Sequence, residues 1–455
     1  MQTDYEWLLV QQRAYFATGA TKQTDFRIEK LHKLKTWIKA NDTKIMSALK
    51  SDLGKSEFEA YTSEIMGLLD EIELAIKKIK TWARPVKVKT PLTLFKASSQ
   101  INYEPYGSVL VISPWNYPFS LSVTALTGAL AAGNCCVIKP SEFSGHTSKL
   151  IAEMVQECFD KSYCTVIQGG VEETTALLEH RFDFIHFTGS TSVGKIIAQA
   201  AAKHLTPTVL ELGGKSPCIV DETADIETSS RRICWGKFMN AGQTCIAPDY
   251  ILVHEKIKEQ LVQSLQAQIK TFYGEDPQQS NDYGRIINQS HFDRLCQFLT
   301  EGKIVCGAQT DKKHLYIAPT VIEDVSWQHP VMQGEIFGPI LPVLVYKDLE
   351  QLMAQLQKQE KPLALYLFSK NKTTQQKVMD TLQFGGGCIN ATIMHIVNPN
   401  LPFGGVGHSG MGNYHGKWSF ETFSHKKSIL NKSLLFDLKL LYPPYKNKLR
   451  WLRKT

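Results

Sequence analysis

Short apolar runs that alternate with helical stretches constrain the fold of this chain more than any other feature. In the first half of the sequence, the runs cover Ser108–Ile112, Cys135–Ile138, Cys164–Ile167, Asp183–Phe187 and Thr208–Leu212. Runs of this length suit buried strands, and the intervening segments are long enough for crossover helices. Because such crossovers are right-handed and join parallel strands, the pattern predicts a doubly wound parallel sheet.

A second series of the same kind occupies the other half of the chain. Its runs cover Cys218–Val220, Tyr250–Val253, Leu341–Tyr346, Leu363–Phe368 and Gly387–Asn390. Helical stretches such as Glu255–Phe272 lie between them, whereas the first 80 residues are helical and Arg84–Ser99 suggests a crossing segment or exposed strand. A chain of 455 residues has room for two or three domains, so we predict an α/β fold with two doubly wound domains.

Composition and charge exclude several classes of protein. Hydrophobic residues at 43% and charged residues at 21% exclude a disordered or collagen-like chain. The formal net charge is +7, but the last 24 residues alone carry +6, so the body lacks the basic surface of a nucleic-acid-binding protein. The ten cysteines form no CxxC pair and no cluster with histidine at zinc-ligand spacing. We therefore expect no metal site and a reducing, cytoplasmic setting.

Neither a secretory signal nor a membrane span is expected from the apolar segments. The N-terminus has no apolar run longer than Trp7–Val10. Residues Pro105–Ile138 are uncharged, but Pro114, Asn116 and Pro118 interrupt them before an apolar stretch of about 20 residues can form. We interpret this region as a buried strand–helix–strand.

The segment Phe187–Gly194 predicts a strand, a turn of small residues and a helix from about Thr191. The free amides at the start of that helix would favour a phosphate beside Gly189 and Ser190. The GxGxxG pattern of dinucleotide-binding turns is incomplete, because only Gly189 and Gly194 are present. A plain strand-to-helix turn is the alternative.

Glu211 and Cys245 are candidate reactive residues. Cys245 lies among small residues in Gly242–Ala247, where amides or a cofactor's positive charge would lower its pKa and supply thiolate. Glu211 ends a predicted strand, where desolvation would raise its pKa towards the range of a general base. Taken singly, a cysteine is more often an inert small apolar residue, and a glutamate is more often solvated or salt-bridged.

Polar residues also follow two further predicted strands. Asn116, between Pro114 and Pro118, is a candidate donor to an oxyanion, although an asparagine more often caps a turn. Lys139 and Glu142 place a cation and an anion at the carboxyl edge of the sheet. They would either bind ribose hydroxyls or form a surface pair.

Taken together, these motifs resemble the NAD(P)-dependent aldehyde dehydrogenase superfamily, and its class 3 and fatty aldehyde branch most. The resemblance covers about residues 5–430, and its motifs stand in the family's order: Ser113–Phe119, Lys139–Glu142, Phe187–Gly194, Glu211–Lys215, Gly242–Ala247, Glu335–Pro339 and Pro402–Gly407. The short N-terminus and Gly410–Gly416 favour this branch.

The resemblance implies a role for each candidate residue. Cys245 would be the nucleophile, Glu211 the general base and Asn116 a donor to the oxyanion, together with the Cys245 amide. The implied cofactor is NAD, with NADP left open. Its contacts would be Lys139 and Glu142 at the adenosine ribose, Gly189, Ser190 and Gly194 along the pyrophosphate, Glu335 at the nicotinamide ribose and Phe337 beside the ring.

The resemblance also implies a division into domains and a homodimer. A Rossmann-type cofactor domain would comprise residues 1–83 and 100–210, and a catalytic domain residues 211–399. Residues 84–99 and about 400–430 would form a bridging and oligomerisation segment, with the glycine-rich run Phe403–Gly412 near the catalytic funnel. Residues 431–455 would form a basic amphipathic tail.

The implied reaction is oxidation of an aldehyde to a carboxylic acid through a thioester on Cys245. One alternative is an acylating enzyme that passes the acyl group to coenzyme A, which Glu211 opposes because it would activate water. Another is a catalytically inactive, membrane-associated scaffold, which the intact catalytic set opposes.

The tail is the most individual feature of the sequence. Leucines and Phe436 precede Pro443–Pro444, and Lys and Arg then alternate with Tyr445, Leu449, Trp451 and Leu452. The apolar run is too short and too charged to span a membrane. We hypothesise peripheral attachment to anionic lipid, which would favour a fatty or terpenoid aldehyde. Packing on the partner subunit, or disorder, is the alternative.

Overall fold

The apolar runs of the first half form a parallel sheet, as expected from their pattern. The computed structural model describes residues 5–446 and 448–453. Its first sheet runs in the order β17-β7-β6-β3-β4-β5, and only the β17–β7 pairing is antiparallel. The strands are β3 (Ser108–Ile112), β4 (Cys135–Lys139), β5 (Cys164–Val166), β6 (Phe184–Thr188), β7 (Thr208–Glu211) and β17 (Gly410–Met411). The Pro105–Ile138 region is β3, a buried helix and β4, which agrees with its interpretation.

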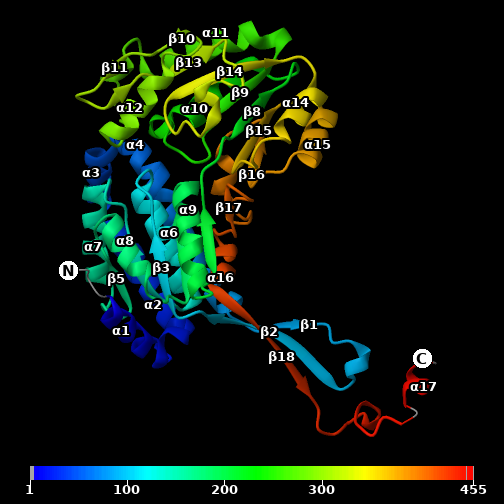
Figure 1. Cartoon of the computed structure of the whole chain (residues 1–455). Coiled ribbons are helices and arrows are strands. Elements are labelled where there is room, and N and C mark those ends of the chain that lie inside the picture. Colours follow the sequence, from blue (N-terminus) through cyan, green and yellow to red (C-terminus); the bar gives the residue numbers. More distant parts are fainter. Residues whose placement is uncertain (1–4, 447, 454–455) are drawn as a thin grey trace.

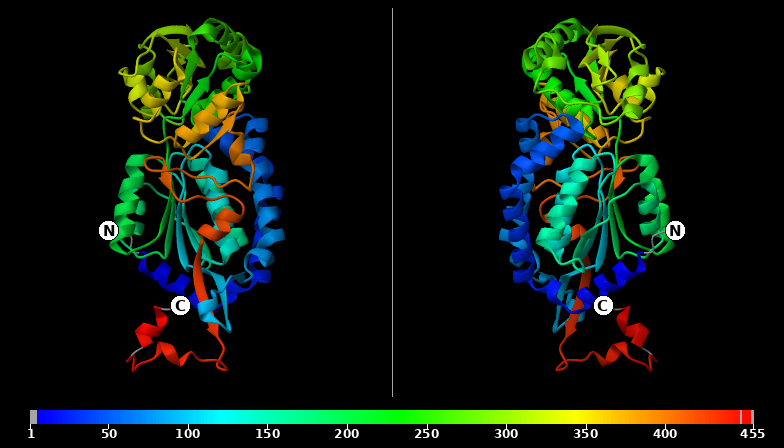
Figure 2. Two further views of the ribbon diagram at one scale, coloured as in Figure 1. Left: turned by 90° about the vertical axis from the view of Figure 1, so that its right-hand side faces the viewer. Right: turned by 90° about the vertical axis from the view of Figure 1, so that its left-hand side faces the viewer.

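Helices cover both faces of this sheet (Figure 2). On one face, α6 (Pro118–Ala132) and α7 (Gly145–Cys158) pack under the N-terminal helices α2 (Thr24–Ala40), α3 (Asp42–Leu53) and α5 (Gly67–Trp82). On the other face lie α1 (Glu6–Ala17), α8 (Val171–Leu178) and α9 (Thr191–Lys203). Between α3 and α5, the chain passes through α4 (Glu57–Ala60) and the π-helical turn η2 (Tyr61–Met66).

The second series forms another sheet, in the order β10-β13-β14-β9-β8-β15-β16. Its strands are β8 (Pro217–Val220), β9 (Tyr250–His254), β10 (Lys303–Cys306), β13 (Thr320–Glu323), β14 (Ile340–Tyr346), β15 (Ala364–Phe368) and β16 (Gly386–Ile389). The sequence pattern missed β10 and β13, the antiparallel pair at one edge. A large core surrounds this sheet. Its helices include α10 (Ile226–Phe238), α11 (Lys258–Tyr273), α12 (Gln289–Phe298), α14 (Leu349–Leu356) and α15 (Lys372–Thr381).

A narrow antiparallel sheet extends away from the first unit (Figure 1). It consists of β1 (Val86–Val88), β2 (Ala97–Pro105) and β18 (Ser424–Lys432), with β2 in the middle. The boundary expected at residue 99 therefore falls inside β2. Within the segment expected at 400–430, β17 instead joins the first sheet, and α16 (Lys417–Thr422) packs on α6. The division into domains stays a prediction.

The tail continues from the end of β18, beyond this narrow sheet (Figure 1). It contains the short helices η8 (Lys439–Leu441) and α17 (Lys448–Leu452), and the side chains of Leu434 and Leu435 are fully exposed. Lys454 and Thr455, which belong to the predicted tail, lie outside the described residues. Among the helices in the described part of the chain, none has the length and apolar character needed to cross a membrane.

Candidate active site

The carboxyl ends of β3, β4, β6 and β7 meet at one edge of the first sheet, because these strands are parallel. The register places Lys139 beside Ile112, and Glu211 beside Thr188. The chain passes from Glu211 directly into the second unit, which faces this edge (Figure 1). Residues after each strand are thereby gathered between the two units.

Glu211 is the last residue of β7, which lies between β6 and β17, and its side chain is buried. Neither of its carboxylate oxygens has a hydrogen-bond partner among the described residues. Burial raises the pKa of Glu211 well above its ordinary value. The effect expected from desolvation is therefore present in this structure.

Cys245 lies in a loop that follows η4 (Met239–Gly242), where Asn240 and Ala241 have φ values of 53° and 51°. Gly242, with φ 75°, has no room for a side chain, since a Cβ would overlap the carbonyl of Gly338. The loop is thus pressed against the Glu335–Pro339 segment, and the Cys245 thiol is only partly exposed.

The pKa of Cys245 is raised to about 12, contrary to the expected lowering. Burial is the main cause, and the charges of Glu335 and Glu211 add to it. The amides of Cys245 and Ile246 do lower the pKa, as expected, but burial outweighs them. The influence of both carboxylates shows that the fold brings residues 211, 245 and 335 together.

Asn116 reaches the Cys245 loop from the first unit. Its buried side-chain Nδ2 donates to the carbonyl of Gln243 at 3.0 Å. The neighbouring Tyr117 hydroxyl lies 2.6 Å from the Thr244 hydroxyl. Two consecutive residues of the loop after β3 are therefore fixed against the two residues that precede Cys245.

Lys139 ends β4, and Glu142 follows it closely in the next loop. The Lys139 ammonium is buried, donates to the Pro140 carbonyl at 2.8 Å and lies 3.7 Å from a Glu142 carboxylate oxygen. Burial lowers the pKa of Lys139, and the charge of Glu142 partly offsets this. Glu142 is 37% exposed, so its carboxylate is available to a ligand.

Gly189 and Ser190 form the turn from β6 into α9, and Gly194 lies in the first turn of that helix. The Gly189 amide donates to the Glu211 carbonyl at 2.9 Å, and the exposed Ser190 caps the helix by accepting from the Val193 amide at 3.4 Å. Gly194 lies against Leu212, which a Cβ would contact at 2.5 Å. The helix end therefore lies beside the Glu211 strand.

Glu335 and Phe337 lie in the segment of the second unit that leads into β14. A Cβ on Gly213 would overlap the Glu335 carboxylate, which also accepts a hydrogen bond from the Gly214 amide. Burial and the charge of Asp249 raise the pKa of Glu335 to about 8. Phe337 has φ 50°, and its ring packs edge-on against Trp115 with centroids 5.3 Å apart.

The comparisons with known proteins agree on one family. Residues 4–429 match the aldehyde dehydrogenase family. The chain belongs to the aldehyde dehydrogenase family. It is 50% identical over 443 residues to the 4,4'-diaponeurosporen-aldehyde dehydrogenase of Staphylococcus aureus, covering 97% of this chain and 96% of that protein. It is 49% identical to the dimeric, NADP-preferring aldehyde dehydrogenase of Rattus norvegicus, over 95% of this chain and 96% of that one.

A solved structure leads to the same family. The substrate-bound state of Staphylococcus aureus AldH superposes with a TM-score of 0.97 at 49% identity, over 99% of both chains. The predicted fold class, the resemblance, and the prediction of an aldehyde dehydrogenase enzyme with NAD(P) as cofactor are confirmed at the level of the family.

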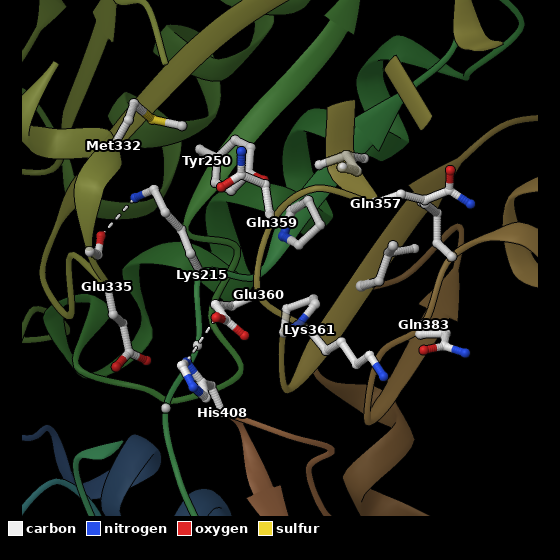
Figure 3. Close-up of a pocket in the computed structure, with 18 of the residues that line it drawn as sticks. Lys215, Tyr250, Met332, Glu335, Gln357, Gln359, Glu360, Lys361, Gln383 and His408 are labelled. Carbon is white, nitrogen blue, oxygen red and sulfur yellow. Dashed lines mark hydrogen bonds and ion pairs between the residues drawn. The ribbon is translucent and has the colours of Figure 1, made fainter. Parts of the chain in front are cut away.

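A cavity of about 630 Å³ opens beside Glu335 in this aldehyde dehydrogenase. Figure 3 shows Lys215 and Glu335 on one side of it, and Lys361 and Gln383 on the other. Gly213 and Thr191 also line the cavity, so it adjoins the expected cofactor residues. Cys245, Glu211 and Asn116 do not line it.

Lys215 is a residue of the dehydrogenase site whose role the sequence analysis missed. Its ammonium donates to Asp249 at 2.7 Å and to the carbonyls of Val331 and Gly334 at 2.8 and 2.9 Å. Asp249 in turn accepts from the Ile336 amide at 3.0 Å. The pair thus holds the backbone on both sides of Glu335. The Glu211–Lys215 motif drew attention to Lys215, but no local sequence pattern indicated that Lys215 would pair with Asp249.

Proposed function

We propose that this enzyme oxidises an aldehyde to a carboxylic acid through a thioester on Cys245. The observation that carries the proposal is the convergence of three groups. A carboxylate without a hydrogen-bond partner, Glu211, acts electrostatically on the Cys245 thiol, and the Asn116 amide is fixed beside the same loop. A nucleophile, a base and an amide donor in one place make up the set needed for acyl transfer.

The Cys245 thiol first loses its proton to solvent. Its sulfur then forms a bond to the carbonyl carbon of the aldehyde as the carbonyl π bond breaks towards oxygen. The charge that develops on the carbonyl oxygen accepts hydrogen bonds from the Asn116 side-chain amide and the Cys245 backbone amide. Asn116 donates one N–H to Gln243, and among the described residues no acceptor takes its second N–H, which can serve this purpose. Each such donor is worth roughly 3–4 kcal/mol of barrier.

The nicotinamide of a bound NAD or NADP supplies the hydride acceptor. Loss of hydride leaves the acyl group on Cys245. Glu211 then takes a proton from water, the resulting hydroxide adds to the thioester carbonyl, and the carbon–sulfur bond breaks. The products are the carboxylic acid and the Cys245 thiolate. Desolvation raises the pKa of Glu211 above that of a free carboxyl, which makes its ionised form a stronger base.

The residues between the two units fit a dinucleotide. Glu335 is a half-buried carboxylate with a raised pKa at the edge of the cavity, and ribose hydroxyls would donate hydrogen bonds to it. Glu142 offers the same chemistry beside Lys139. The exposed start of the 13-residue helix α9 offers free amides to a pyrophosphate. We propose these roles for Lys139, Glu142, Gly189, Ser190, Gly194 and Glu335, with Phe337 beside the nicotinamide.

We propose a medium- or long-chain apolar aldehyde as the substrate. The name of the Staphylococcus aureus relative, a diaponeurosporen-aldehyde dehydrogenase, supports this. Steady-state kinetics with straight-chain aldehydes from C3 to C16, each with NAD and NADP, test the proposal. We expect kcat/KM to rise with chain length. A maximum at C3 would contradict the chain-length proposal, and no reduction of either cofactor would contradict the activity.

The same assay separates the alternative reaction. An acylating enzyme would need coenzyme A for sustained turnover, whereas hydrolysis by Glu211 does not. We expect the same rate of NADH formation with and without 1 mM coenzyme A. A coenzyme-A-dependent rate would assign the acylating activity.

The tail supports a second proposal, peripheral attachment to anionic membranes. Leu434, Leu435 and Leu449 are exposed on a segment rich in lysine and arginine, which fits a surface that is both apolar and negatively charged. Truncation after Ser433 should abolish co-sedimentation with phosphatidylglycerol vesicles at low salt. Equal co-sedimentation of the truncated and full-length chains would contradict the proposal.

We also propose a homodimer in the cytoplasm. The rat relative is named as dimeric, and the narrow sheet of β1, β2 and β18 offers a surface for a second copy. Its exposed apolar residues include Val86, Val88 and Leu430. All ten cysteines are free thiols, as a reducing compartment would keep them. Light scattering at micromolar concentration tests the oligomeric state.

A further inference from the structure

A buried ion pair from the N-terminal helices lies behind Asn116. Lys55 precedes α4, and Glu64 lies in η2. Both side chains are fully buried and contact each other directly. The Lys55 ammonium also donates to the backbone carbonyl of Asn116 at 3.1 Å.

We propose that Lys55 and Glu64 are positioning residues, which hold the Asn116 amide where the oxyanion forms. This inference rests on the proposed function, because it assigns the pair to the oxyanion site. Within the described part of the chain, no hydrogen bond or ion pair joins the side chain of Lys55 or Glu64 to Cys245. Their effect on the reaction passes through the Asn116 backbone.

The ion pair makes hydrogen bonds at both ends of the turn that carries Asn116. Lys55 binds the carbonyl of Asn116, and its ammonium lies 4.0 Å from the centre of the Tyr117 ring. Glu64 accepts from the amides of Phe119 and Ser120 at 2.9 and 3.1 Å, in the first turn of α6. Movement of the turn would break these hydrogen bonds together.

The same carbonyl is also tied to the nucleophile loop. The Asn240 side-chain amide donates to the Asn116 carbonyl at 2.8 Å and to the Gln243 carbonyl at 3.2 Å. Asn116 itself donates to Gln243. Hydrogen bonds therefore run without a gap from Lys55, through Asn116, to the loop of Cys245.

Stability alone is a poor explanation for this pair. Desolvation of two buried charges offsets most of their attraction, and apolar side chains of similar volume are often equally stable. A buried pair of this kind is better explained by the geometry that it imposes. Here the pair fixes the position of the Asn116 side-chain amide, which must donate to the charge that develops on the carbonyl oxygen.

A double-mutant cycle on the full-length enzyme, assayed with decanal and NAD, tests the proposal. Asn116→Ala should lower kcat by about 100-fold or more. Lys55→Met should lower kcat by a similar factor, since a misplacement of about 1 Å can cost about 100-fold. The double variant should be no slower than Asn116→Ala alone, because both changes remove the same contribution.

Three further measurements separate positioning from folding. The dissociation constant of NAD should be unchanged in Lys55→Met, and Lys55→Arg should recover part of the lost kcat. Lys35→Met is the matched control, because Lys35 pairs with Glu73 at 2.5 Å in the same helical region but does not contact the Asn116 turn. It should keep the parental kcat.

The outcomes are distinguishable. A fully active Lys55→Met variant, or losses that multiply in the double variant, would overturn the positioning role while leaving the proposed function intact. A fully active Asn116→Ala variant would overturn the oxyanion role and this inference with it. If Lys55→Met fails to fold because it leaves the Glu64 charge alone, Lys55→Met/Glu64→Gln removes both charges, and the same cycle applies to it.

Discussion

Replacement of Glu211 by glutamine should separate the two halves of the proposed reaction. The change keeps the shape of the side chain but removes the base that activates water. Formation of the thioester needs Cys245 and Asn116, which are unchanged, so one equivalent of NADH should still appear rapidly. Steady-state turnover should fall by about 10²–10⁴-fold, the usual contribution of a general base.

The same variant should lose less folding stability than the parent as the pH rises from acidic to neutral values. The Glu211 carboxylate is buried without a partner, and its pKa in the folded protein lies well above the ordinary value. A raised pKa means that folding favours the protonated form, so stability is fully present below about pH 4 and is lost as the pH rises. The loss is about 1.36 kcal/mol per pH unit, and by pH 7 it reaches at most about 3–4 kcal/mol.

Glutamine carries no charge and escapes this loss. Its amide would be as poorly partnered as the carboxyl, but that cost does not vary with pH. Urea unfolding of both proteins between pH 4.5 and 7.5, followed by circular dichroism, measures the difference. We expect the difference in the free energy of unfolding to move steadily in favour of Glu211→Gln as the pH rises.

Two results would refute this reasoning. Equal loss of the burst and of turnover would show that Glu211 acts before the thioester forms. A stability difference that does not change with pH would show that the carboxyl is solvated in the folded protein. Cofactor binding, measured by fluorescence titration, should be unchanged and serves as the control.

Two further predictions concern the Cys245 thiol and the Glu335 carboxylate. In the cofactor-free enzyme, iodoacetamide should alkylate Cys245 roughly tenfold faster for each pH unit between pH 7 and 9, because the pKa of Cys245 is about 12. Peptide mass spectrometry measures this rate. A plateau of the rate near pH 8 would contradict the prediction. Gly213→Ala should raise the KM for NAD or NADP roughly tenfold, because a Cβ there overlaps the Glu335 carboxylate, whereas Gly334→Ala has open space and should match the parent. Equal KM values for both variants would show that Glu335 does not contact the cofactor.

The positions of strands and motifs were predictable because they depend on short stretches of sequence. The run Cys135–Ile138 is apolar and bounded by polar residues, and it forms β4 with one further residue. The helix predicted to start near Thr191 starts there, capped by Ser190. The edge strand β10 and its inner neighbour β13 escaped prediction. Lys303 and Ile304 of β10 are exposed, and so carry no buried apolar pattern.

Several features of the site depend on contacts between residues far apart in the chain. Gly410 of β17 pairs with Glu211 of β7, although the two residues are 199 positions apart in the chain. The bond from Lys55 to Asn116 joins segments 61 residues apart. No local pattern distinguishes a charge destined for burial, such as Lys55, from its solvated neighbours in the N-terminal helices.

The sequence by itself determined the alternation of strands and helices, the order of the motifs and the candidates for the reactive groups, because local patterning and side-chain chemistry reside in the residues themselves. Only the tertiary structure decided how the pKa values of those groups are shifted. Cys245 was expected to have a lowered pKa, yet burial and two carboxylates raise it. The electrostatic free energy of a side chain depends on everything that surrounds it, and those surroundings exist only when the chain has folded.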